Sequence, residues 1–129
     1  PLGEALLAPT RIYVRPLLAL YAAQEIHALA HITGGGLPEN LPRVMPENTR
    51  ARIDASAWPR PAVFDWLQQQ GGISDEEMLR TFNCGIGMVV VLPEEGVDAA
   101  QTLLREQGIE SFLIGRIEAG DGRPEVIVQ

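Results

Sequence analysis

The sequence contains no lysine: all ten of its basic residues are arginines. A P-loop, a Schiff-base lysine and a lysine general base are therefore excluded within this chain, because each depends on a lysine amine. The single cysteine, Cys84, excludes an internal disulfide and any zinc site that needs several cysteines. Several common chemistries of nucleotide and metal sites are thus unavailable to this chain.

Long apolar runs are also missing. No run approaches the roughly 20 residues that a membrane helix needs, and the N-terminus lacks the basic-then-apolar pattern of a secretion signal. We therefore expect a cytoplasmic protein without a membrane partner. The net charge of −7, with arginines scattered along the chain, argues against sequence-independent binding to nucleic acid.

The length and composition of the sequence are those of a globular chain. Its 129 residues, of which 46% are hydrophobic and 21% charged, fit one domain over residues 1–129 with a real core. The chain begins at Pro1 without methionine, and we expect it to be part of a longer protein.

Hydrophobic periodicity and turn residues predict alternating helices and strands. Helices are expected over 16–24, 62–69, 75–81 and 93–107, with at most a short helix across 36–41. Strands are expected over 10–14, 26–32, 49–53, 87–92, 111–118 and 125–128, with Ala51 and Ile53 on one face of the third and the unbroken apolar run at 87–92 buried on both faces. Ser74 and Glu77 form a capping box for the helix at 75–81, and Gly71 and Gly72 end the helix before it. The last two strands are expected to form a hairpin through the Gly- and Asp-containing turn at 119–124. The pattern predicts a layered α/β (α+β) domain with one mixed β-sheet and flanking helices.

Thr33, Gly34, Gly35 and Gly36 follow the strand expected over 26–32. Consecutive glycines cost backbone entropy on folding, but they allow unusual dihedral angles and the close approach of a ligand to the backbone. Their N–H groups are also available to an anion. The loop is therefore a candidate substrate or phosphate site. The more ordinary interpretation is a tight turn, and the pattern is not the GxGxxG of a dinucleotide fold.

Two histidines, His27 and His31, lie on the strand before this loop. Residues four apart share one face of a strand, and His31 is only two residues from the loop. His31 is accordingly the candidate to meet a substrate, and the alternative is a hydrogen-bonded histidine at a sheet edge. The segment lacks the glutamate of HExxH, so no metal site is predicted.

A second cluster of unusual residues precedes the strand expected over 87–92. Asn83 tolerates left-handed backbone, and Gly85 exposes main chain. Cys84 is either a nucleophile with His31 as its base or, more commonly for such a residue, a small buried side chain. Arg11, next to Thr10, is either an anion-holding side chain or a member of a surface ion pair. Asp54 and Asp65 are expected to be caps or surface groups.

Several segments together resemble one family. They are PTRIYV (9–14), HALAHITGGGLPENLPR (27–43), VFDWLQ (63–68) and MLRTFNCGIGM (78–88), followed by the closing strands. They resemble the C-terminal domain of the phosphoribosylformylglycinamidine cyclo-ligase (aminoimidazole ribonucleotide synthetase) family. The resemblance covers essentially the whole chain, and HITGGG followed by FNCG is its most specific part.

The resemblance implies a two-domain, homodimeric ligase of purine biosynthesis. Such an enzyme uses ATP to close formylglycinamidine ribonucleotide into aminoimidazole ribonucleotide, and an N-terminal domain absent from this chain holds most of the ATP and Mg²⁺ ligands. This chain alone is then expected to be inactive. By resemblance, the residues lining the cleft are Thr10, Arg11, His31, Thr33, Gly34, Gly35 and Gly36, with Asn83, Cys84 and Gly85 nearby.

Two other functions remain open from the residues alone. One is a stand-alone α/β module that binds a phosphorylated small molecule or a protein partner without chemistry. The other is a hydrolase that uses Cys84 and His31.

Overall fold

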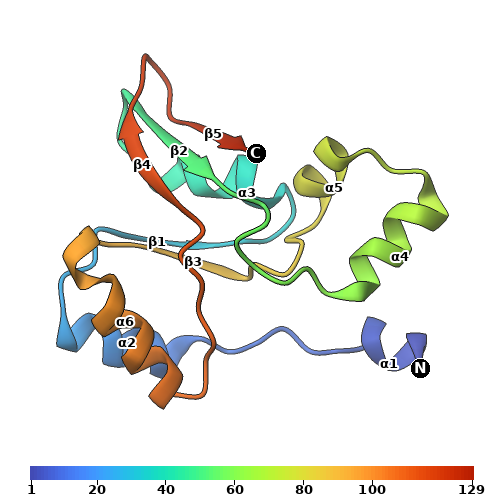
Figure 1. Cartoon of the computed structure of the whole chain (residues 1–129), viewed down its shortest axis with the longest axis horizontal. Coiled ribbons are helices and arrows are strands. Elements are labelled where there is room, and N and C mark those ends of the chain that lie inside the picture. The colour runs from blue at the N-terminus through green and yellow to red at the C-terminus, as the bar shows by residue number, and fades with distance from the viewer.

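The computed structural model describes residues 1–129 as alternating short helices and strands (Figure 1). No helix in it combines the length and the apolar character needed to cross a membrane. The helices are α1 (Leu2–Leu6), α2 (Val14–Ala23), α3 (Gly36–Asn40), α4 (Ala62–Gly71), α5 (Asp75–Thr81) and α6 (Val97–Glu106), with 3₁₀ turns η1 (Leu41–Val44) and η2 (Glu94–Gly96). The strands are β1 (Ala28–His31), β2 (Thr49–Ile53), β3 (Met88–Val91), β4 (Gly115–Ala119) and β5 (Glu125–Val128). The expected α/β class is confirmed.

The strands form two sheets, so the expectation of one mixed sheet was wrong. β1 pairs with β3 in an antiparallel ladder, and β2 lies at the centre of a second sheet of order β4-β2-β5. β2 is antiparallel to β4 and parallel to β5, so only this second sheet is mixed. Two ion pairs support its central place: Arg52 with Glu118 of β4 at 2.8 Å, and Arg50 with Glu125 of β5 at 2.5 Å.

The expected hairpin between the last two strands was also wrong, because β2 lies between them. The turn after β4 closes on Asn48, the residue before β2, instead of on its own two strands. Gly120 N–H donates to the Asn48 carbonyl at 2.9 Å, and Gly122 N–H donates to Asn48 Oδ1 at 3.0 Å. The Asn48 N–H in turn donates to the Gly122 carbonyl at 2.7 Å. These bonds hold the turn over the start of β2. The chain therefore passes from β4 on one side of β2 to β5 on the other side.

Apolar side chains cover both faces of the β1–β3 ladder. On one face Ala30 and Val89, which are paired in register, join the larger core cluster beneath the β4-β2-β5 sheet. On the other face Val90 packs against the smaller cluster formed by α2 and α6. Figure 1 accordingly shows the ladder between that sheet and the α2–α6 pair. The expectation of a strand covered on both faces at 87–92 is confirmed.

Most of the local predictions are confirmed. Ala51 and Ile53 share the buried face of β2. Ser74 caps α5, since its Oγ accepts the Glu77 N–H at 3.2 Å. Gly72 ends α4 in the left-handed conformation. Asp54 is a turn cap that accepts hydrogen bonds from the Ser56 side chain and N–H, and these bonds lower the pKa of its carboxyl.

The strand expected over 10–14 does not form. Residues 7–13 make no ladder and are mostly exposed, and Val14 and Arg15 already belong to α2. The β-rich composition of this segment was misleading because no neighbouring strand is available to pair with it. The strand expected from 111 likewise begins only at Gly115, where pairing with β2 starts.

Candidate functional site

The β1–β3 ladder brings together the two glycine-containing motifs that the sequence analysis singled out. Because the strands are antiparallel, the end of β1 lies beside the start of β3, with His31 opposite Met88. Just beyond the ladder, Ile32 N–H donates to the Gly87 carbonyl at 2.9 Å. The glycine loop (residues 33–36) and the FNCG turn (residues 82–85) therefore lie at the same edge of the molecule.

Asn40 holds the glycine loop in its conformation. Its side chain is 5% exposed, and its Nδ2 group lies 2.8 Å from the Gly36 carbonyl, 3.2 Å from that of Thr33 and 3.3 Å from that of Gly34. Its Oδ1 accepts the Thr33 hydroxyl at 3.3 Å. One buried amide thus joins three carbonyl groups of the turn, one of which, that of Thr33, also accepts the Gly36 N–H. Sequence reasoning missed this role, because an asparagine at the end of a short helix carries no distinctive local signal.

The three glycines are present for different reasons. Gly36 has φ 60°, and a Cβ there would lie 1.7 Å from the Leu79 carbonyl oxygen of α5. Gly35 has φ 97°, and a Cβ there would meet the Glu39 side chain. Gly34 has neither a left-handed backbone nor any atom within 4 Å of such a Cβ. Packing therefore explains Gly36 and Gly35, whereas the open space at Gly34 is unused within this chain.

The amides of the loop are only partly open to an anion. Gly36 N–H donates to the Thr33 carbonyl at 2.9 Å, whereas the N–H groups of Gly34 and Gly35 donate to no acceptor within the chain. The carboxylate of Glu39 lies directly against Gly35 and would repel an anion there. Gly34 is thus the position in the loop best suited to the approach of a phosphate or another ligand.

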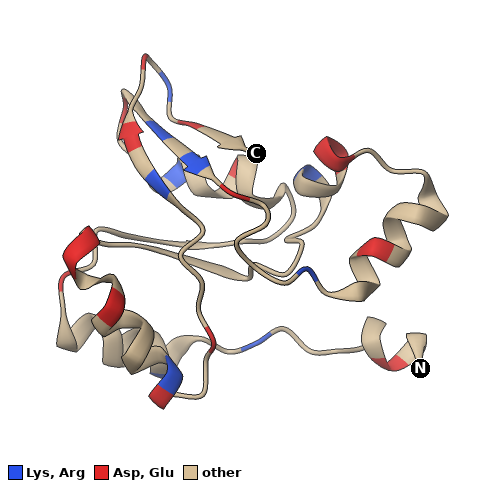
Figure 2. Ribbon diagram, viewed as in Figure 1, with Lys and Arg blue, Asp and Glu red and all other residues tan.

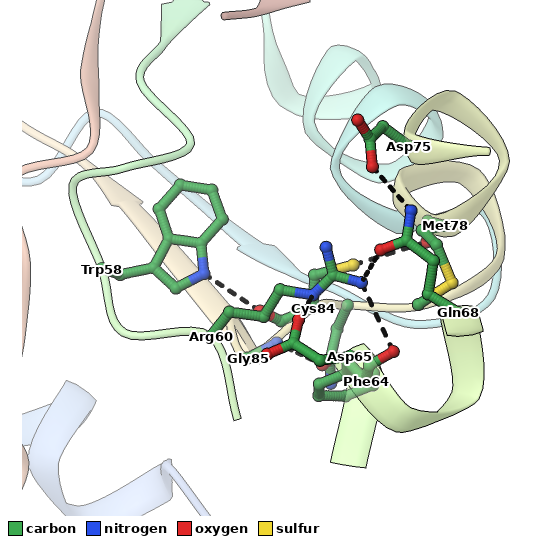
Figure 3. A network of polar contacts seen from close by, with 10 residues as sticks. Trp58, Arg60, Phe64, Asp65, Gln68, Asp75, Met78, Cys84 and Gly85 are labelled. Atoms are coloured by element: carbon green, nitrogen blue, oxygen red, sulfur yellow. Dashed lines mark hydrogen bonds and ion pairs between the residues drawn. The ribbon is translucent and has the colours of Figure 1, made fainter. Parts of the chain in front are cut away.

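A clamp from residues 58–61 fixes the FNCG turn (Figure 3). Trp58 Nε1–H donates to the Cys84 carbonyl at 3.0 Å, and Pro61 occupies the space where a side chain at position 85 would lie. Within the turn, Asn83 Oδ1 accepts the Gly85 N–H at 2.9 Å. Cys84 adopts the left-handed conformation with φ 50°. Side chains distant in sequence therefore hold the turn in an otherwise uncommon conformation.

Arg60 connects this clamp to α4 and α5. Its Nε lies 3.2 Å from Asp65 Oδ1, and its Nη2 donates to Gln68 Oε1 at 3.0 Å. Gln68 Nε2 donates in turn to Asp75 Oδ1 at 2.6 Å, at the start of α5 (Figure 3). Asp65 is thus an ion-pair partner, as expected for a surface group. The sequence analysis missed Trp58 and Arg60 as supports of the turn, because their partners lie in other elements.

Cys84 has the environment of a structural cysteine. It is 1% exposed, and its Sγ lies 3.5 Å from the Met78 carbonyl oxygen. Burial raises the pKa of the thiol, against the opposing effect of the nearby Arg60 charge. A nucleophilic cysteine needs a lowered pKa and access to a substrate. The hydrolase hypothesis with Cys84 and His31 is therefore not supported.

His31 lies exposed at the end of β1. Its ring meets the edge of the Tyr13 ring, with 6.4 Å between centroids. The Tyr13 hydroxyl also lies against Gly87, where a side chain would force the Tyr13 ring to move. Tyr13, Asn83, Gly85 and Gly87 line a concave surface of about 530 Å³ together with residues 61–64, Ala5 and Ala8. The FNCG turn thus borders this hollow, whereas His31 and the glycine loop do not line it, and His31 reaches it only through its contact with Tyr13.

Thr10 and Arg11 are placed elsewhere. Both are exposed, and neither forms a hydrogen bond or ion pair with the glycine loop. Arg11 instead lines a second depression with Arg15 and residues 107–109 beyond α6. The other histidine, His27, lies 3.1 Å from Glu25. No three histidine, cysteine, aspartate or glutamate side chains gather as metal ligands.

Solved structures with this fold include two other kinds of protein. Two crystal structures of Escherichia coli HypE, a hydrogenase maturation protein, match with TM-scores of 0.66 and 0.69 at 17% and 18% identity. They cover 89% and 98% of this chain and 35% and 40% of HypE. Thiamine-monophosphate kinase from Stenotrophomonas maltophilia matches with a TM-score of 0.57 and 19% identity, over 81% of this chain and 31% of that protein. The fold is thus an α/β domain found within larger proteins.

The sequence itself defines the family. Residues 1–127 match the family described as AIR synthase related protein, C-terminal domain, and the chain belongs to this family. A phosphoribosylformylglycinamidine cyclo-ligase from Nitrosococcus oceani is 58% identical over 124 residues, which are 95% of this chain and 35% of that protein. The chain thus spans about a third of the length of this curated relative. The resemblance noted in the sequence is confirmed.

The different roles of the glycines lead to a stability prediction. Gly36→Ala is expected to lower the free energy of unfolding by about 2–4 kcal/mol, because it combines a left-handed backbone with a collision against α5. Gly34→Ala is the matched control and is expected to change it by less than about 0.5 kcal/mol. Urea denaturation of the chain measures both values, and equal losses would contradict the assignment.

The environment of Cys84 leads to a second prediction. In the folded chain at pH 7 the thiol is expected to react with a disulfide reagent only as fast as the structure opens, and His31→Ala should not change that rate.

The same thiol predicts how stability depends on pH. Because its pKa is raised in the folded state, it contributes to the free energy of unfolding below the ordinary cysteine pKa of about 8.5, and this contribution falls as pH rises beyond that value. The wild type should therefore lose more stability than Cys84→Ala between pH 8 and pH 10. In the labelling experiment, rapid reaction of Cys84 that depends on His31 would contradict the structural role of this cysteine.

Proposed function

We propose that this chain is the C-terminal portion of an ATP-dependent phosphoribosylformylglycinamidine cyclo-ligase. The observation that carries the proposal is the 58% identity to the Nitrosococcus oceani cyclo-ligase across 95% of this chain. The structural neighbours add support for the fold alone, because their identity is below 20%. The proposed reaction converts formylglycinamidine ribonucleotide and ATP into aminoimidazole ribonucleotide, ADP and phosphate.

In this proposal the chain contributes one wall of the active site. The wall is the glycine loop with the FNCG turn, and the opposite wall, with most ligands of ATP and Mg²⁺, belongs to an N-terminal portion of the same polypeptide. Support comes from the open backbone at Gly34 and from the hollow bordered by Asn83 and Gly85. The lack of lysine agrees with this division, because any phosphate site that depends on a lysine would come from the other portion. A homodimer is the proposed assembly.

The chemistry assigns different tasks to the residues of this wall. ATP activates the formyl oxygen, ring closure by an amidine-side nitrogen follows, and phosphate leaves. Gly34 would let a phosphate or the ribonucleotide lie against the main chain, where the N–H groups of residues 34 and 35 have no acceptor within the chain. His31 is the candidate for handling a proton, because its imidazole is exposed at the edge of the same site. The Thr33 hydroxyl donates to Asn40 and so supports the loop, while Thr10 and Arg11 would act only from a more distant position.

A hybrid enzyme tests the proposed function. The C-terminal third of the Nitrosococcus oceani enzyme is replaced by this chain, and formation of aminoimidazole ribonucleotide is measured with ATP and Mg²⁺. The hybrid is expected to turn over within about tenfold of the parent, because the two sequences share 58% of their residues in this region. This chain alone should form no product.

The alternative, a stand-alone module that binds a phosphorylated small molecule, makes the opposite prediction. It predicts a folded but inactive hybrid and a native gene product of about 14 kDa. A cooperative thermal transition confirms that the hybrid is folded before its activity is judged.

Within the hybrid, Gly34→Ala tests the position assigned to the ligand. A methyl group there meets nothing in this chain and is expected to obstruct only a bound ligand, so kcat/KM should fall about tenfold, or roughly 1.4 kcal/mol, while the melting temperature stays constant. Gln70→Ala, an exposed change on α4, serves as the control. Unchanged kcat/KM in Gly34→Ala would remove the glycine loop from the site.

A further inference from the structure

Helix α2 is apolar almost all the way round. Only Arg15 is charged among the ten residues from Val14 to Ala23. A helix with this composition is normally covered on all sides, whereas one at a surface carries charge on its outer face. By contrast, its neighbour α6 has charged residues at both ends (Figure 2). The sequence of α2 is therefore that of an interior helix.

Only one side of α2 is covered in this chain. Pro16 and Leu20 are buried, and Leu20 packs with Ala100 and Leu104 of α6. The opposite side carries Val14, Leu18 and Tyr21, which are spaced i, i+4 and i+7 and so lie on one face. These side chains are 60%, 64% and 70% exposed. Together with Ile12, which precedes the helix and is also exposed, we call them the α2 apolar stripe.

The neighbouring residues indicate the chemistry of what covers the stripe. Ile12 and Val14 also line the second depression, of about 690 Å³, together with Arg11 and Arg15. Neither arginine has an ion-pair partner in this chain. An apolar surface with carboxylates at its edge would complement both the stripe and the two guanidinium groups.

The length of the relative indicates where such a surface comes from. The matched residues make up 35% of the Nitrosococcus oceani enzyme and belong to a family defined as a C-terminal domain. About two thirds of that polypeptide therefore lies outside the match. The stripe falls within the first 21 residues of this chain, and the exposed segment 7–13 leads to it from α1, which lies beside α4 at the other end of the molecule (Figure 1). An N-terminal portion of the polypeptide would connect ahead of α1, and at about two thirds of the relative's length it is large enough to extend along this segment to the stripe.

We propose that the α2 apolar stripe is the surface on which the N-terminal portion of the same polypeptide packs, with carboxylates of that portion meeting Arg11 and Arg15. This inference rests on the proposed function in one respect, namely that the chain is part of a longer polypeptide. It assigns α2 the task of setting how the two portions sit against each other. Packing at α2 would then fix the position of the glycine loop relative to the N-terminal portion.

Thiol labelling at single introduced cysteines tests the inference. Leu18→Cys reports on the stripe, and Asp121→Cys reports on the exposed turn between β4 and β5, far from α2 in Figure 1. Each is placed in this chain and in the hybrid enzyme, and labelling rates are read by mass spectrometry of the peptides. Native Cys84 is buried and contributes little background. Tyr21→Cys is the second reporter should Leu18→Cys prevent folding of the hybrid.

The expected result is that both positions label rapidly in this chain, while position 18 is protected roughly tenfold or more in the hybrid and position 121 is not. Equal labelling of position 18 in both proteins would overturn the inference. Protection of position 18 in this chain that increases with protein concentration would also overturn it, because a second copy would then be the occupant.

The readout separates this inference from the proposed function. Protection at position 18 in a folded hybrid that forms no product would contradict the function and support the surface. Product formation without protection would support the function and contradict the surface.

Discussion

The antiparallel ladder between β1 and β3 is the interaction on which the rest of this structure depends. Its two faces join the larger core beneath the β4-β2-β5 sheet to the smaller core between α2 and α6. Its end also determines where the two functional motifs lie, because an antiparallel pair places the segment after β1 beside the segment before β3. The β1–β3 pairing, which ends at His31 and Met88, thus organises both the packing of the domain and its candidate site.

Much of the candidate site is maintained by residues that do not face a ligand. Asn40 satisfies the carbonyls of the glycine loop, while Trp58 and Pro61 hold the FNCG turn. This support explains how Cys84 remains in a left-handed conformation, which a non-glycine residue adopts only where its surroundings favour it. Cys84, Gly35 and Gly36, which the sequence marks as candidate site residues, are therefore explained at least in part by packing. The backbone at Gly34 is what remains open for function.

Apolar side chains are covered in the larger core but exposed on α2. The larger core is closed, yet α2 exposes a face that its composition marks as interior. The glycine loop likewise leaves two amides without partners at an open edge. Both features agree with a domain that functions against a second part of the same polypeptide, and they lie on different sides of the β1–β3 ladder.

The features that depend on local chemistry could be predicted from the residues alone. Alternation predicted the buried face of β2, Ser74 marked the start of α5, and HITGGG with FNCG identified the family. Only the tertiary structure decided that β2 separates β4 from β5, since that depends on bonds between Asn48 and Gly122, 74 residues apart. It also placed Arg11 away from the glycine loop and revealed Asn40 as the support of that loop. Periodicity and capping act over a few residues, whereas strand order and the burial of a polar side chain depend on which distant segments meet.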